Sequence, residues 1–174
     1  MAKYLIIIDM QRDFVTGALG TAEARALTPS LCAYARQFDG KVFFTQDTHQ
    51  EDYLSTQEGR LLPVKHCIEG SEGWRIVPEL EDVFARADAV FCKPAFGSPE
   101  LARELRRRFE AGEVDAVELA GVCTDICVVS NALLIKAFLP EVPVAVLSAL
   151  CAGVTPEKHE AALETMRSCQ IEVR

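Results

Sequence analysis

A series of short apolar runs, each followed by a helix-like segment, constrains the fold of this chain more than any other feature. Continuous apolar runs of this length are typical of strands that are buried on both faces. Strands that alternate with helices predict a parallel sheet with helices on both sides. We therefore expect a three-layer α/β/α fold around a mostly parallel, five- or six-stranded sheet. The predicted strands are residues 4–8, 41–45, 89–92, 114–120 and 142–147, with 171–173 as a short edge strand.

Proline-containing pairs predict where several of the helices begin. A Ser or Thr followed by Pro is a favourable N-cap and first helical residue. Helices are accordingly predicted from Thr28-Pro29, Ser98-Pro99 and Thr155-Pro156, and a further helix over residues 78–86. The two glycines in residues 10–20 predict an irregular loop, and the weak periodicity of residues 48–73 predicts a second one. A loop as long as the second is usually functional in a compact domain.

Composition narrows the class of protein. A chain of 174 residues fits one domain, residues 1–174, with 49% hydrophobic and 25% charged residues as in ordinary soluble proteins. A net charge of −8 argues against a nucleic-acid surface. No signal peptide or membrane span is visible. The odd number of cysteines, 7, indicates reduced thiols, so we expect a cytoplasmic protein.

Chemically useful side chains follow the predicted strands. Asp9, Asp47 and Lys93 each stand at a strand end, and Cys123 and Cys127 lie in the turn after the fourth strand. The carboxyl ends of parallel strands share one edge of the sheet, so these residues are expected to converge.

The turn at residues 121–128 contains the candidate nucleophile. If Thr124 caps the next helix, Cys127 lies in its first turn, where the positive end of the helix dipole lowers the pKa of a thiol. The alternative is that Cys127 is a small core residue, as many free cysteines are. A thiol, a carboxylate and an ammonium in one pocket would suit acyl transfer to sulfur followed by hydrolysis, which is amidase chemistry.

The long loop offers metal ligands. Asp47, His49 and His66 combine a carboxylate with two imidazoles, and Glu58 supplies a further carboxylate. Such donors suit zinc, manganese or iron. Each of them taken alone is more often a surface residue.

Taken together, these segments resemble the isochorismatase-like cysteine hydrolases and, among them, the nicotinamidases. The resemblance is carried by residues 8–19, by 93–96, by 121–128 and by the loop with Asp47, His49 and residues 62–73. It implies a Rossmann-like fold and a catalytic triad of Asp9, Lys93 and Cys127. It also implies a cis peptide bond between Val122 and Cys123, and an oxyanion hole formed by the backbone N–H groups of Cys123 and Cys127.

The resemblance further implies a divalent metal, zinc first, on Asp47, His49 and His66, with Glu58 as an additional ligand. Phe14 and Phe96 are expected to contact a small amide substrate, although for Phe14 taken by itself a core position is the default. A homo-oligomer is implied as well.

The leading hypothesis is hydrolysis of nicotinamide to nicotinate and ammonia, in NAD salvage. One alternative is a related metal-binding amidase that acts on another small amide. The other is a metal-binding or redox-sensing protein without catalysis, in which Cys123 and Cys127 form a switch. Asp9 and Lys93 favour the hydrolase, because a thiol sensor requires neither. The family usually has an apolar residue at Cys123 and often Asn at Arg12, so this chain departs from it there.

Overall fold

The computed structural model, which describes residues 1–174, is built around a six-stranded sheet in the order β3-β2-β1-β4-β5-β6. Every pair of neighbouring strands is parallel, so the predicted α/β architecture is confirmed, and the sheet is parallel throughout. The strands are β1 (Ala2–Ile8), β2 (Lys41–Asp47), β3 (Ala89–Lys93), β4 (Val114–Val122), β5 (Val144–Ala152) and β6 (Glu172–Val173).

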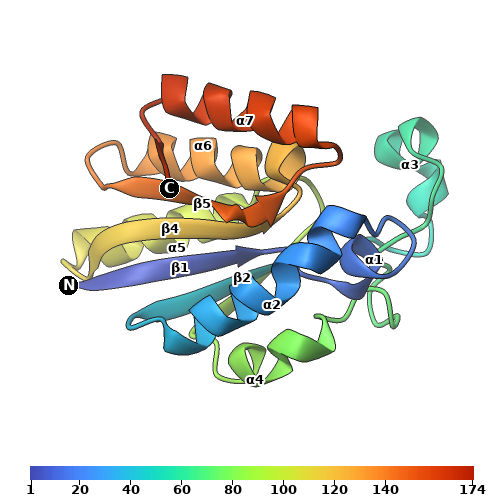
Figure 1. Cartoon of the computed structure of the whole chain (residues 1–174), viewed down its shortest axis with the longest axis horizontal. Helices are drawn as coiled ribbons and strands as arrows, with labels where there is room; N and C mark the ends of the chain where they lie inside the picture. Colours follow the sequence, from blue (N-terminus) through green and yellow to red (C-terminus); the bar gives the residue numbers. More distant parts are fainter.

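Helices cover both faces of the sheet (Figure 1). On one face lie α5 (Pro99–Glu110), α6 (Val129–Phe138) and α7 (Pro156–Ser168), and on the other lie α2 (Ala22–Gln37) and α4 (Glu81–Phe84). Strand β1 contributes alternately to the two cores, with Ile6 and Ile8 in the first and Leu5 and Ile7 in the second. This double burial explains the continuous apolar runs of the sequence.

Helix α2 begins earlier than the sequence predicted. Its N-cap is Thr21, whose side chain accepts a hydrogen bond from the backbone N–H of Ala24 at 3.0 Å. Pro29 therefore lies inside the helix and not at its start. It sits on the exposed face, where solvent can replace the hydrogen bond that a proline cannot donate. The predictions at Ser98 and Thr155 are confirmed, because both side chains cap the helices that follow.

The two predicted loops contain short helical segments. These are α1 (Arg12–Val15), η1 (Tyr53–Ser55) and α3 (Gln57–Leu61), and a further short helix, η2 (Pro78–Leu80), precedes α4. Helix α3 begins at Thr56, whose side chain accepts from Gly59 N at 3.0 Å. A Cβ at Gly59 would lie 2.0 Å from the carbonyl oxygen of Tyr53, so this tight turn requires glycine.

The order of the strands places a topological switch between β1 and β4. The chain runs from β1 outward to β2 and β3, and then returns to β4 on the other side of β1. Ligands of open α/β sheets bind at the carboxyl edge of such a switch point. Gly121 allows the two strands to approach there, because a Cβ would lie 2.2 Å from the carbonyl oxygen of Ile8. None of the helices combines the length and apolar character needed to cross a membrane.

Candidate active site and metal centre

The side chains predicted at the strand ends gather at this carboxyl edge. Asp9 directly follows β1, whereas Asp47 and Lys93 end β2 and β3 and pair with each other in register. Cys127 lies after β4 in η3 (Thr124–Val128), a single π-helical turn. All four are buried.

Lys93 is the centre of this cluster. Its ammonium Nζ lies 2.6 Å from Oδ2 of Asp9, 3.3 Å from Oδ1 of Asp47 and 3.4 Å from Sγ of Cys127. The ammonium also donates to the carbonyl oxygen of Ala95 at 3.1 Å. On its other side, Asp9 accepts a hydrogen bond of 2.6 Å from the hydroxyl of Thr45. A carboxylate, an ammonium and a thiol therefore share one enclosed space.

The turn that carries Cys127 differs from the predicted N-cap. Its N-cap residue is Cys123, which forms no side-chain cap, and the Val128 N–H donates to the Cys123 carbonyl at 3.0 Å in a π-type bond. Thr124 is already helical, and its hydroxyl lies 2.8 Å from Nδ1 of His159 on α7. The prediction failed because this distant imidazole takes the hydroxyl that would have capped the helix.

The peptide bond between Val122 and Cys123 is cis, the form that the family resemblance implies. The N–H of Cys123 donates to no backbone acceptor in the chain. Cys123 lies between the end of β4 and the turn that contains Cys127.

The predicted lowering of the Cys127 pKa is wrong. Burial raises the pKa of this thiol well above its ordinary value, the Asp9 carboxylate raises it further, and Lys93 only partly opposes them. Burial likewise raises the pKa of Asp9 against the attraction of Lys93. Although burial disfavours its charge, the neighbouring Asp9, Cys127 and Asp47 raise the pKa of Lys93.

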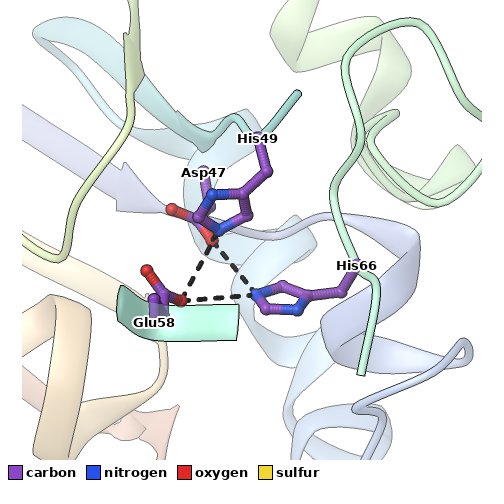
Figure 2. Close-up of side chains that lie close together, drawn as sticks. All are labelled: Asp47, His49, Glu58 and His66. Carbon is purple, nitrogen blue, oxygen red and sulfur yellow. Dashed lines mark hydrogen bonds and ion pairs between the residues drawn. The ribbon is translucent and has the colours of Figure 1, made fainter. Parts of the chain in front are cut away.

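Asp47, His49, Glu58 and His66 converge beside this cluster (Figure 2). Their ligand atoms all lie within 4.8 Å of one another. Nε2 of His49 is 3.0 Å from Oδ2 of Asp47 and 3.6 Å from Oε1 of Glu58, and Nε2 of His66 is 3.5 Å and 3.8 Å from the same two oxygens. Burial opposes ionisation of Asp47, but hydrogen bonds from both histidines, with the charge of Lys93, lower its pKa.

Neighbouring residues hold these ligands in place. The Nδ1 atom of His66 lies 2.8 Å from the carbonyl oxygen of Val64, which directs Nε2 toward the cluster. The buried ring of Tyr53 packs against His49 and His66 at centroid distances of 4.7 and 5.0 Å. Gln11 receives a hydrogen bond from Asp47 N and donates one to Asp47 O, both at 2.8 Å. Sequence reasoning missed Tyr53 and Gln11, whose roles depend on contacts between distant segments.

This donor set fits a divalent transition metal. It combines two imidazoles with two carboxylates, and the fixed Nδ1 contact of His66 is the outer-sphere support that metal-bound histidines usually have. Glu58 lies on α3, a short helix that the sequence did not predict, and this helix brings it to the other three ligands.

The thiol and the metal-ligand group open onto one cavity of about 260 Å³. Phe14 and Phe96, the expected substrate contacts, both line it. Apolar side chains from several loops, which sequence reasoning did not single out, complete the wall. The lining residues are Phe14, Leu19, Thr21, Asp47, Glu58, Leu62, His66, Phe96, Cys123, Ile126, Cys127 and Val154.

Comparison with known proteins gives a consistent picture. A nicotinamidase/pyrazinamidase of Mycobacterium tuberculosis is 32% identical, and the match covers 98% of this chain and 97% of that protein. The structure of the pyrazinamidase of Pyrococcus horikoshii in complex with zinc is 30% identical with a TM-score of 0.81, covering 100% of this chain and 99% of the other. The structure of PnC1 from L. infantum in complex with nicotinate is 25% identical with a TM-score of 0.83, covering 99% and 92%.

The family model described as the isochorismatase domain matches residues 3–174, nearly the whole chain. The chain therefore belongs to the isochorismatase family of hydrolases.

Proposed function

We propose that this protein is a cysteine amidohydrolase that converts nicotinamide and water to nicotinate and ammonia. The observation that carries the proposal is the shared cavity: Cys127 lines the same 260 Å³ space as Asp47, Glu58 and His66. One small molecule can thus reach the thiol with its amide and the metal-ligand group with its ring. The relatives named for nicotinamidase and pyrazinamidase activity support this choice of substrate.

In the first half of the reaction, Asp9 accepts the proton of the Cys127 thiol as the sulfur attacks the amide carbon. The raised pKa of Asp9 suits a group that takes up and later releases a proton. The ammonium of Lys93, 3.4 Å from Sγ, stabilises the sulfur as it loses its proton. The N–H groups of Cys123 and Cys127 are assigned to the oxyanion, and the free Cys123 N–H supports this.

In the second half, Asp9 returns the proton to the leaving nitrogen, and ammonia departs from a thioester on Cys127. Asp9 then takes a proton from the attacking water. Collapse of the second tetrahedral intermediate breaks the carbon–sulfur bond, Asp9 returns its proton to the sulfur, and the nicotinic acid that leaves ionises to nicotinate. The buried position of Asp9 and Lys93 shields these proton transfers from bulk solvent.

Asp47, His49, Glu58 and His66 would hold the metal. When bound, it supplies a Lewis-acid site for the ring nitrogen of the substrate or for a water. Zinc is our first choice, supported by the zinc complex of the Pyrococcus horikoshii relative, with manganese and iron as alternatives. Phe14 and Phe96 are assigned to the walls of the ring site. The expected homo-oligomer stays a prediction.

The test measures ammonia release from nicotinamide and from benzamide, which lacks the ring nitrogen. Zinc-loaded protein is expected to favour nicotinamide, and a chelator is expected to raise the Michaelis constant far more than it changes alkylation of Cys127. Protein that binds no metal and hydrolyses both amides equally would contradict the nicotinamide assignment. Activity confined to another small amide would favour a related amidase, and a reversible thiol switch without any hydrolysis would favour a sensor.

A further inference from the structure

A second, apolar groove lies beside the catalytic cavity. The groove has a volume of about 490 Å³ and is lined by Gln57, Glu58, Leu61, Leu62, Phe96 and Ile126. Glu58, Leu62, Phe96 and Ile126 also line the cavity that contains Cys127. The two spaces therefore lie side by side along a border formed by these four residues.

Large apolar side chains of the groove face solvent. Leu61 is 79% exposed and Phe96 is 45% exposed, although one lies on α3 and the other in the loop after β3. Clustered exposed apolar side chains commonly mark a ligand or partner site. A protein partner seated here would cover the border with the cavity and block substrate entry, which favours a ligand.

The orientation of a bound ring decides which part of it meets the groove. Lys93 lies 3.4 Å from Cys127 and 3.3 Å from Asp47 and is fully buried, so it lies behind the wall between the thiol and the metal ligands. A nicotinamide that spans these two groups turns the carbon between its carboxamide and its nitrogen, C2, toward Lys93. The opposite carbon, C5, then points away from this buried wall, toward the mouth where Leu61 and Phe96 are exposed.

We infer that the groove is a subsite for an uncharged, apolar substituent on the outer edge of an aromatic amide. This rests on the proposed amidase function and narrows its substrate class to ring-substituted aromatic amides. Leu61, Leu62 and Phe96 supply the apolar contact.

The experiment compares kcat/KM for nicotinamide and 5-propylnicotinamide in three zinc-loaded proteins: wild type, Leu61→Lys and Leu54→Lys. Leu61 lines the groove and not the catalytic cavity, whereas Leu54 is a matched control that is 47% exposed and lines neither. Wild type is expected to prefer the propyl compound by roughly 10-fold. Leu61→Lys should remove that preference and leave nicotinamide hydrolysis within about twofold. Leu54→Lys should change neither value.

Calorimetric binding of nicotinate and 5-propylnicotinate to the same proteins separates this inference from the proposed function. Suppose that neither amide is hydrolysed, but 5-propylnicotinate binds more tightly than nicotinate and only Leu61→Lys removes this difference in affinity. The amidase function then fails and the subsite stands. If nicotinamide is hydrolysed but the propyl group brings no gain in rate or binding, the subsite is overturned. It is also overturned if sedimentation shows that Leu61→Lys dissociates an oligomer, because a second copy would then occupy the groove.

Discussion

Replacing Lys93 with methionine tests the charge arrangement of the site. Methionine keeps an unbranched side chain of similar length and removes the ammonium. In the wild type this ammonium is 0% exposed and lies 2.6 Å from Asp9 and 3.3 Å from Asp47. The substitution therefore leaves two neighbouring buried carboxylates without their common counter-charge.

The cost follows from this geometry. Removing one partner of a buried ion pair typically destabilises a protein by about 3–5 kcal/mol. Lys93→Met is expected to lower the free energy of unfolding by at least that much, out of a total of roughly 5–15 kcal/mol. Lys41→Met is the matched control, because the Lys41–Asp88 pair at 2.8 Å is on the surface and its lysine side chain is 48% exposed. Lys41→Met should lower the free energy of unfolding by about 0–1 kcal/mol.

The assay is urea unfolding of metal-free protein, followed by circular dichroism between pH 5 and 8. The raised pKa of Lys93 gives the wild type a contribution that is complete below the ordinary lysine pKa and constant over this range. In the variant, Asp9 loses the attraction of Lys93, so its already raised pKa increases further. The folded variant then binds more protons than its unfolded chain. The difference in free energy of unfolding between wild type and variant should therefore become smaller as the pH falls.

Two results would refute this reasoning. The first is a loss in Lys93→Met no larger than that in Lys41→Met. The second is a difference in free energy of unfolding between wild type and variant that stays the same at every pH. The double variant Lys93→Met/Asp9→Asn gives an independent check, because neutralising one carboxylate should restore part of the lost stability.

Further predictions concern the proposed roles in catalysis. Cys127→Ala should abolish ammonia release, whereas Cys123→Ala should retain most of it because only its backbone is used; equal losses would contradict these roles. Asp9→Asn should lower kcat by roughly 10²–10⁴. The same variant has no carboxylate to accept the proton of the Cys127 thiol, so its labelling by iodoacetamide should be slower than in the wild type, and an unchanged rate would contradict thiol activation by Asp9. His66→Ala should lose zinc, measured by elemental analysis, and raise KM while Cys127 remains open to alkylation; a variant that keeps its zinc would exclude His66 as a ligand.

Much of the fold follows from the sequence, because its signals are local. Apolar runs such as the one ending at Ile8 indicate strands buried on both faces, and the caps at Ser98 and Thr155 lie beside the helices they start. A parallel sheet brings the carboxyl ends of its strands to one edge, so the proximity of Asp9 and Lys93 could be predicted without coordinates.

Features that depend on contacts between distant segments were decided by the tertiary structure. The local sequence predicts that Thr124 caps its helix, but in the folded protein its hydroxyl pairs with His159 on α7. The position of Cys127 in a helical turn favours a low thiol pKa, yet burial and Asp9 reverse that effect, and burial exists only after the layers have packed. The groove beside the cavity also depends on tertiary structure, because Leu61 on α3 and Phe96 after β3 come from separate segments and no local pattern predicts that they lie together.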